Sequence, residues 1–143
     1  MSVSFINKLF KSKSNDDFCT AVVLAAGNSQ RMGKDKILMP LGGAPVIAHT
    51  LKALQSAECI DEIVVVTKYE RLQELADICH DHGISKASKV VVGGKTRLES
   101  SLIGVSNADE RAKYIAIHDG ARPFVTNSLI ERVVHSAHQH GAS

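Results

Sequence analysis

The sequence predicts an α/β fold in which a mostly parallel, Rossmann-like sheet carries helices on both faces. Short, almost continuously apolar runs rich in β-branched residues alternate four times with longer segments of helical periodicity. Strands that are apolar along their whole length are typical of parallel sheets buried on both faces. Each helix is then expected to connect two parallel strands as a right-handed crossover.

The first half of the chain supplies two strands and the helix between them. Residues 20–24 (TAVVL) form the first expected strand, which runs into a polar, glycine-rich stretch. Apolar residues then recur at helical spacing over residues 45–57, with Pro45 suited to the first turn of that helix. Residues 62–67 (EIVVVT) form the second strand.

The next helix, strand and helix follow in the same order. Residues 70–82 place apolar side chains on one face of a helix, which Gly83 is expected to end. Residues 89–92 (KVVV) form the third strand, and residues 97–107 form the next helix.

The last two elements are a strand over residues 114–118 (YIAIH) and a C-terminal helix. Ser128 followed by Glu131 is a capping-box pattern that favours a helix start there, and Gly141 is suited to its end. The alternation calls for a further strand at the point where the sequence stops, so we expect a truncated domain.

Composition indicates one globular domain without a nucleic-acid or membrane partner. The 143 residues are 44% hydrophobic and 22% charged, which is ordinary for a soluble domain. A formal net charge of +2 is too small for a basic nucleic-acid or membrane surface. No apolar run approaches the roughly 18 residues that would cross a bilayer.

The cysteines and the N-terminus favour a cytoplasmic protein. Cys19, Cys59 and Cys79 form no CxxC pair, and an odd number of widely spaced thiols is typical of a reducing compartment. We expect all three to be buried and inert. The polar, lysine-containing start of the chain lacks the hydrophobic block of a signal peptide.

Three of the four loops that follow strands have residues suited to a ligand. In open parallel sheets, ligands bind beyond the carboxyl ends of the strands. Residues 25–36 combine glycines with cationic side chains, residues 93–97 read GGKTR, and residues 118–123 read HDGARP. Glycines let a ligand approach the backbone, and lysine and arginine neutralise phosphate charge. Asp119, at a strand end, is a candidate ligand for a hard cation.

Other interpretations of these residues remain open. The first loop is not a Walker A motif, because five residues separate Gly27 from Gly33 and Asp35 follows Lys34. It could be a solvated surface loop, and Asp119 could cap a turn. Ser100 lacks the partners of a catalytic triad. The three histidines near the C-terminus, His135, His138 and His140, are better explained by the dipole of the last helix than by a metal.

Taken together, the three motifs resemble the 2-C-methyl-D-erythritol 4-phosphate cytidylyltransferase family of the non-mevalonate isoprenoid pathway. The matching segments are AAGNSQRMGKDK at residues 25–36, GGKTRLES at residues 93–100 and HDGARP at residues 118–123. The resemblance covers nearly all of residues 19–143, which would be the nucleotide-binding part of the enzyme domain, and leaves residues 1–18 as an N-terminal tail. It implies a fold of the nucleotide-diphospho-sugar transferase type.

The resemblance also implies an activity and roles for individual residues. CMP would be transferred from CTP to a sugar-alcohol phosphate with Mg²⁺ as the cofactor, and the full-length protein would be a homodimer. Arg31 and Lys36 would be catalytic at the α-phosphate, and Asp119 would be both catalytic and the metal ligand. The implied substrate-binding residues are Ala25, Ala26, Gly27, Gly93, Gly94, Arg97, Ser100, Gly120 and Arg122.

The sequence departs from the family pattern at two positions and in length. Asp35 precedes Lys36 where the family usually has proline, which changes the stiffness expected of that loop. Lys95 follows the glycine pair where an acid is common. Family members are considerably longer, and their remaining part carries a dimerisation arm and further substrate-binding residues.

Two alternative functions remain open. One is a cytidylyltransferase for ribitol 5-phosphate, which shares the motifs, although Ala26 favours methylerythritol because the relatives often have glycine there. The other is a fragment that binds nucleotide without turnover.

Overall fold

The computed structural model describes residues 17–27, 30–31 and 34–141. Its centre is a four-stranded sheet of β1 (Cys19–Ala25), β6 (Glu62–Thr67), β7 (Ala87–Val92) and β8 (Tyr114–Asp119). The strand order is β7-β6-β1-β8, and every pair is parallel. The predicted parallel sheet is therefore confirmed. Each expected strand lies within the bounds of an observed strand.

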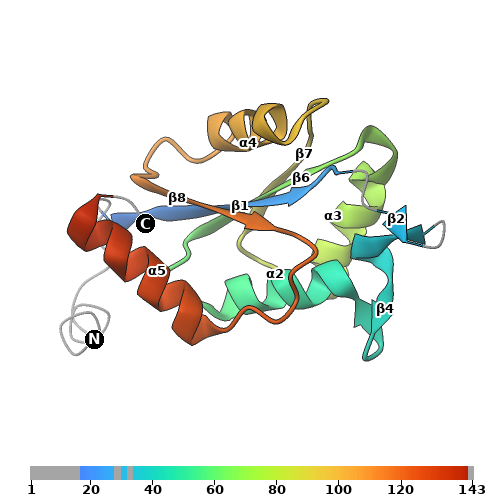
Figure 1. The fold of residues 1–143 in the computed structure, drawn as a ribbon, viewed down its shortest axis with the longest axis horizontal. Coiled ribbons are helices and arrows are strands. Elements are labelled where there is room, and N and C mark those ends of the chain that lie inside the picture. The colour runs from blue at the N-terminus through green and yellow to red at the C-terminus, as the bar shows by residue number, and fades with distance from the viewer. Residues whose placement is uncertain (1–16, 28–29, 32–33, 142–143) are drawn as a thin grey trace.

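Helices cover both faces of this sheet, as predicted (Figure 1). The helix α4 (Arg97–Ser106) packs on one face. The other face is covered by α2 (Val46–Ser56), α3 (Leu72–Asp81) and α5 (Asn127–His140). A 3-10 turn, η3 (Tyr69–Arg71), leads into α3, and Gly83 and Gly141 adopt positive φ after α3 and α5. Both glycines thus end their helices as expected.

Two helix starts differ from the prediction. Thr126, rather than Ser128, caps α5: its backbone is extended, and its hydroxyl accepts a hydrogen bond from the Leu129 N–H at 3.2 Å. The capping box at Ser128 and Glu131 is therefore wrong, because Thr126 offers an equivalent hydroxyl two residues earlier. Pro45 lies at the cap position of α2, one residue before the first turn.

The segment between β1 and α2 contains short elements that the sequence did not indicate. The two-residue strands β2 (Gln30–Arg31) and β3 (Lys34–Asp35) pair antiparallel, and so do β4 (Pro40–Leu41) and β5 (Ala44–Pro45). Between the two pairs lies the 3-10 turn η2 (Lys36–Leu38). Strands of two residues are too short to show a period in the sequence.

The strand β1 divides the core into two layers because its side chains alternate between the faces of the sheet. Ala21 and Val23 belong to the larger cluster, which includes Ile47 and Leu51 of α2. Val22 packs in a second cluster on the α4 side, where Gly104 lies against it and lets the helix approach the sheet.

A buried carboxylate ties together the amino end of the sheet. One oxygen of Glu62 accepts hydrogen bonds from the Thr20 hydroxyl and the Asp109 N–H, each at 2.8 Å. The other oxygen accepts from the Ser88 hydroxyl at 2.6 Å. Strands β1, β6 and β7 and the segment before β8 are therefore joined at the end of the sheet away from the ligand loops.

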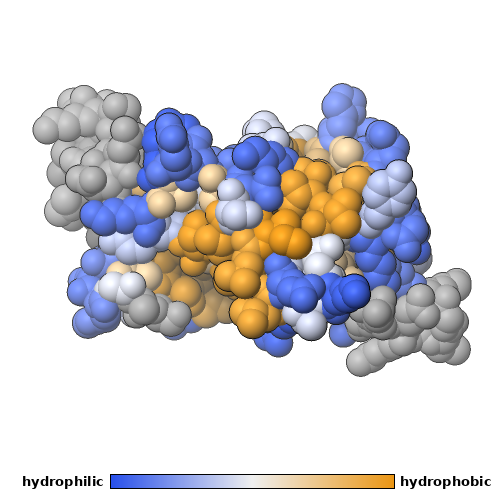
Figure 2. Space-filling view, turned by 90° about the horizontal axis from the view of Figure 1, so that it is seen from above, coloured by the Kyte–Doolittle hydropathy of each residue, from blue (hydrophilic) through white to orange (hydrophobic). Residues whose placement is uncertain are grey.

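The face that carries α4 shows an apolar band (Figure 2). Leu98, Leu102 and Val105 recur at helical spacing on α4 and are 69%, 60% and 39% exposed, and Ile117 on β8 is 44% exposed. Strand β8 is an edge of the sheet within the described residues. In that part of the chain, no helix combines the length and apolar character needed to span a membrane.

Candidate functional site

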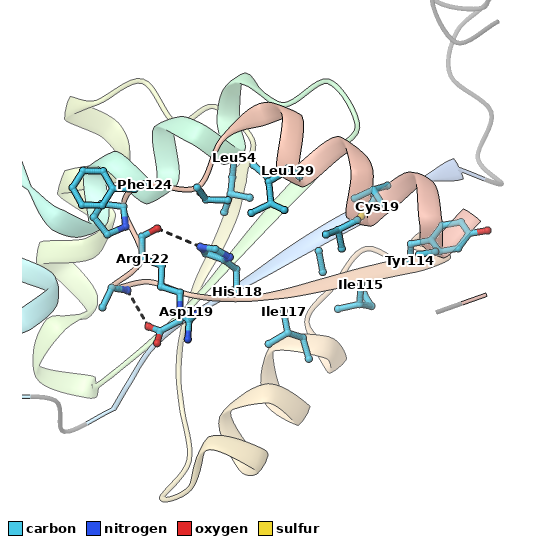
Figure 3. Close-up of a pocket in the computed structure, with 18 of the residues that line it drawn as sticks. Cys19, Leu54, Tyr114, Ile115, Ile117, His118, Asp119, Arg122, Phe124 and Leu129 are labelled. Carbon is cyan, nitrogen blue, oxygen red and sulfur yellow. Dashed lines mark hydrogen bonds between the residues drawn. The ribbon is translucent and has the colours of Figure 1, made fainter. Parts of the chain in front are cut away.

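A groove of about 1250 Å³ runs along the edge strand β8, from Tyr114 at its amino end to the loop beyond its carboxyl end. Its polar end is lined by Lys36 from the loop after β1, Arg97 from the loop after β7, and Asp119 and Arg122 from the end of β8 (Figure 3). Because parallel strands end at the same edge of a sheet, residues far apart in the sequence converge here. Four of the predicted site residues thus line one groove, whereas the others with described side chains or backbone do not line it: Ala25, Ala26, Gly27, Gly93, Gly94, Ser100 and Gly120.

The loop after β8 is folded by a local hydrogen-bond network around Asp119. Its Oδ1 accepts from the Ala121 N–H at 3.0 Å, and its carbonyl accepts from the Arg122 N–H at 3.2 Å. The His118 Nε2 lies 3.5 Å from the Arg122 carbonyl oxygen. Asp119 thus caps a turn, as one alternative had it, but the residue is exposed and its Oδ2 makes no hydrogen bond or ion pair within the described residues.

Gly120 holds this loop against the sheet and α2. Its N–H donates to the Leu24 carbonyl at 2.9 Å, and its carbonyl accepts from the Thr50 hydroxyl at 2.9 Å. A Cβ at this position would lie 2.8 Å from the Ile47 side chain. The structure therefore gives Gly120 a packing role, beside the ribose contact that the family resemblance implies.

The loop after β7 is held by hydrogen bonds from its backbone N–H groups to β6 and to side chains of α4. The Gly93 N–H donates to the Thr67 carbonyl at 2.8 Å, and the Gly94 N–H donates to the Ser100 Oγ at 3.1 Å. A Cβ on Gly93 would lie 2.6 Å from the Ser100 Oγ and 2.8 Å from the Ala26 Cβ. Ala26, Gly93 and Ser100 thus form one tightly packed wall, which is not part of the groove lining.

Ser100 is buried yet keeps one hydrogen-bonding capacity. Its side chain is only 4% exposed, and its oxygen accepts from Gly94, which leaves the hydroxyl proton to donate. The amide N–H groups of Gly93 and Gly94 are already used inside the protein, so a ligand could engage only their carbonyl groups as the loop stands.

The β2–β3 pair and η2 carry the cationic residues of the first loop. Lys36 is the first residue of η2, is half-buried and lines the groove. Arg31 pairs with Lys34 across the two strands, but its side chain, like the residues at 28–29 and 32–33, lies outside the described part of the chain. Ala25 ends β1, and Gly27 is exposed just beyond it.

Several positioning residues were not predicted from the sequence. Thr50 and Asp35 gave no recognisable signal, because their partners lie elsewhere in the chain or depend on a short turn. Thr96, by contrast, had one: it precedes Glu99 by three residues, and its hydroxyl accepts from the Glu99 N–H at 3.1 Å as the cap of α4.

The electrostatics of the groove favour an anionic ligand. Its lining contains four cationic residues, Lys36, Arg97, Lys113 and Arg122, and a single carboxylate, Asp119. Within the described residues no group of three or more His, Cys, Asp and Glu side chains could hold a metal ion by itself. A hard cation at Asp119 would thus need oxygen ligands from a bound molecule, as Mg²⁺ commonly does with phosphates.

The C-terminal histidines form no such metal group either. His138 stacks on Tyr114 with ring centroids 4.2 Å apart, at the far end of α5 from Asp119. Between β8 and α5 the groove is lined by apolar side chains that include Leu129 and Val133, whereas Ile117 lines it from the opposite face of β8, on the α4 side. Figure 3 shows Leu129 on the α5 side of β8 and Ile117 on the other side of that strand, toward α4.

Comparison with known proteins identifies what this arrangement is similar to. A sequence model described as "IspD: 2-C-methyl-D-erythritol 4-phosphate cytidylyltransferase" matches residues 19–143. The enzyme of that name from Clostridium botulinum is 36% identical over 126 residues, which is 87% of this chain and 55% of the relative. The one from Halalkalibacterium halodurans is 37% identical over 120 residues, covering 82% of this chain and 52% of the relative.

A solved structure supports the same assignment. The crystal structure of 4-diphosphocytidyl-2C-methyl-D-erythritol synthase from Anaerococcus prevotii has a TM-score of 0.74 and 25% identity, and the match covers 87% of this chain and 52% of that one. The chain thus spans about half the length of the relatives it matches. It belongs to the IspD family, the 2-C-methyl-D-erythritol 4-phosphate cytidylyltransferases.

Proposed function

We propose that the groove at the carboxyl edge of the sheet binds CTP and transfers CMP to 2-C-methyl-D-erythritol 4-phosphate, a step of non-mevalonate isoprenoid biosynthesis. The observation that supports this most is the convergence of Lys36, Arg97, Asp119 and Arg122 on one groove. Three cations suit a triphosphate and a second phosphorylated substrate.

The reaction needs positioning and charge neutralisation more than proton transfer. An oxygen of the methylerythritol phosphate, already ionised at neutral pH, attacks the α-phosphorus of CTP and forms a new P–O bond. The bond from that phosphorus to the oxygen bridging to the β-phosphate breaks, and its electron pair leaves with pyrophosphate. No general base is required, so the absence of a triad is expected.

Lys36 and Arg31 would oppose the negative charge that develops on the α-phosphate. Arg122 would bind the phosphate of the sugar alcohol, and Arg97 would add positive charge along the triphosphate. The base and ribose would be bound by the remaining substrate-binding residues: Ala25, Ala26, Gly27, Gly93, Gly94, Ser100 and Gly120.

Asp119 fits a Mg²⁺ ion that also takes phosphate oxygens from CTP. Asp119 is exposed, and its Oδ1 accepts the hydrogen bond that fixes the turn. Its Oδ2 has no partner within the described residues and could therefore bind the ion. A bound Mg²⁺ would neutralise phosphate charge. A protein of this fold from Mycobacterium tuberculosis, 22% identical, was solved as a complex with manganese, so a metal titration should include both ions.

A second candidate is a nucleotide-binding unit that does not turn over by itself. It is favoured by the coverage of only 55% or less of the relatives compared above, and by the apolar band over α4 and β8. On this view, the residues that complete the sugar-phosphate site belong to the remaining length of the relatives. We further propose that the full-length protein is a cytoplasmic homodimer, which sedimentation would test.

The deciding experiment combines calorimetry with a pyrophosphate-release assay. CTP should bind with Mg²⁺ or Mn²⁺, and binding should weaken in Asp119→Asn. Release of pyrophosphate with methylerythritol phosphate, but not with ribitol 5-phosphate, supports the proposed reaction. CTP binding without release from this chain, and release once the second half of a relative is joined to it, supports the second candidate. Preference for ribitol 5-phosphate, or no CTP binding, contradicts the proposal.

A further inference from the structure

The residue immediately before Lys36 carries a buried carboxylate that the proposed reaction does not use. The side chain of Asp35 is 5% exposed. Its Oδ1 accepts a hydrogen bond from the Ile37 N–H at 3.4 Å, so Asp35 caps η2. Its Oδ2 lies 3.7 Å from the Nε of Arg71. A buried carboxylate is costly unless a cation and hydrogen-bond donors compensate it, so these contacts specify the position of Asp35.

The cation comes from a different loop and is itself held in place. Arg71 ends η3, which follows β6, and its backbone N–H donates to the Lys68 carbonyl at 2.9 Å. Its Nη1 donates to Glu74 Oε2 of α3 at 2.9 Å. The guanidinium therefore lies between a carboxylate of the first loop and a carboxylate at the start of a core helix.

Asp35 also joins the two short elements that carry the catalytic cations. It pairs with Gln30 across β3 and β2, next to the Lys34–Arg31 pair. It caps the turn whose first residue is Lys36. Asp35 thus adjoins both the turn that begins with Lys36 and the strand pair that includes Arg31.

We propose that Asp35 and Arg71 are positioning residues that hold Lys36 at the groove by tying the first loop to α3. The inference rests on the proposed function for its catalytic consequence. The loop after β6 has no glycine and does not line the groove. It affects Lys36 through the contact between Arg71 and Asp35. Since a misplacement of about 1 Å can cost up to about a hundredfold in rate, a loosely held Lys36 would be a poor catalyst.

The backbone at Asp35 suggests an informative second variant. Its φ of −67° and ψ of 122° match the range that proline imposes. Asp35→Pro removes the carboxylate and, with it, any need for Arg71, but it fixes φ covalently. A rigidifying proline should therefore replace the ionic contact, and Arg71→Ala should do little harm in that background.

Hydrogen exchange on the 143-residue chain tests the structural part of the inference. In Arg71→Ala we expect exchange at residues 34–38 to rise about fivefold or more, since local opening controls exchange. The double variant Asp35→Pro/Arg71→Ala should bring it back towards the original rate. Arg111→Ala is the matched control, because it removes an arginine from an ion pair with Asp109 outside the groove. Unchanged exchange in Arg71→Ala overturns the inference.

A double-mutant cycle in the full-length protein tests the catalytic part. Arg71→Ala should lower kcat about tenfold and change the KM for CTP by less than about twofold. In a Lys36→Ala background the same change should have almost no further effect, because Arg71 acts through Lys36. A raised KM with normal kcat, or fully additive effects, overturns the inference. If the unsubstituted protein has no CTP turnover, the proposed function fails, whereas the exchange result still decides whether Arg71 orders the loop.

Discussion

The Ser100 hydroxyl oxygen accepts a hydrogen bond from the backbone N–H of Gly94 at 3.1 Å. This contact folds the loop after β7 back onto the first turns of α4. Because Ser100 is buried and Gly93 packs on both Ser100 and Ala26, the loop after β1 and the loop after β7 share one wall. The shape of the proposed nucleotide site would therefore depend on Gly93 and Gly94, where a Cβ would lie within 3 Å of neighbouring side chains.

Gly93→Ala is expected to lower the free energy of unfolding by about 1–3 kcal/mol, as overpacking of a tight core contact does. The added Cβ would lie 2.6 Å from the Ser100 Oγ and 2.8 Å from the Ala26 Cβ. Gly27→Ala is the matched control, because nothing lies within 4 Å of a Cβ there. Urea unfolding measures the free energy of unfolding of both variants. Equal values would show that Ser100 and Ala26 can shift at little cost.

Glu62→Ala is expected to cost about 2–4 kcal/mol, because it removes the acceptor for three hydrogen bonds and leaves buried donors unpaired. Glu62→Gln should cost less, since an amide oxygen can still accept. Both variants should bind CTP like the original chain, because Glu62 lies at the amino end of the sheet. Urea unfolding and calorimetry with CTP check the two statements. A large loss of CTP affinity in a folded variant would contradict the claim that Glu62 lies away from the nucleotide.

The Cys79 thiol should resist alkylation in the folded protein. Burial raises its pKa from 9.0 to about 11, so little reactive thiolate forms at about pH 8. The folded state keeps this proton at pH values where the unfolded chain loses it, so this group makes stability fall as the pH rises from about 9 to about 11. Iodoacetamide labelling followed by mass spectrometry tests the expectation. Equal labelling rates with and without urea would contradict it.

Arg111 should control the titration of Asp109. Hydrogen bonds from the Arg111 side chain, then from its backbone, lower the pKa of Asp109 from 3.8 to about 2. The stability that this pair contributes is present above about pH 4 and is lost as the pH falls through about 2. In Arg111→Ala the pKa should return towards 3.8, which carboxyl NMR measures. If the pKa of Asp109 stays near 2 in that variant, a group other than the Arg111 side chain lowers it.

Much of the fold follows from local patterns in the sequence. The second strand, residues 62–67, was predicted with its observed bounds because every residue from Ile63 to Val66 is apolar and β-branched. Gly83 and Gly141 marked helix ends correctly because their positive φ favours glycine. The start of α5 was missed because Thr126 and Ser128 are equally good caps by type, and only the backbone distinguishes them.

The part of the candidate site that could be predicted is the part that follows from the carboxyl ends of parallel strands lying at one edge of the sheet. That rule places Lys36 and Asp119 at one edge whatever their separation in the sequence. It says nothing of contacts that depend on side-chain direction, such as Asp35 with Arg71 or Thr50 with Gly120. The three cysteines were expected to be buried, and Cys19 and Cys79 are, whereas Cys59 is half-buried.

The central claim is that three loops distant in the sequence form one binding site for a nucleoside triphosphate. Backbone NMR of the 143-residue chain, titrated with CTP and Mg²⁺, tests it most directly. The account predicts shift changes at Lys36, at Gly93 and Gly94, and at Asp119 and Arg122 with a single dissociation constant. Changes confined to one of these loops, or centred on Glu62 at the opposite end of the sheet, would contradict it.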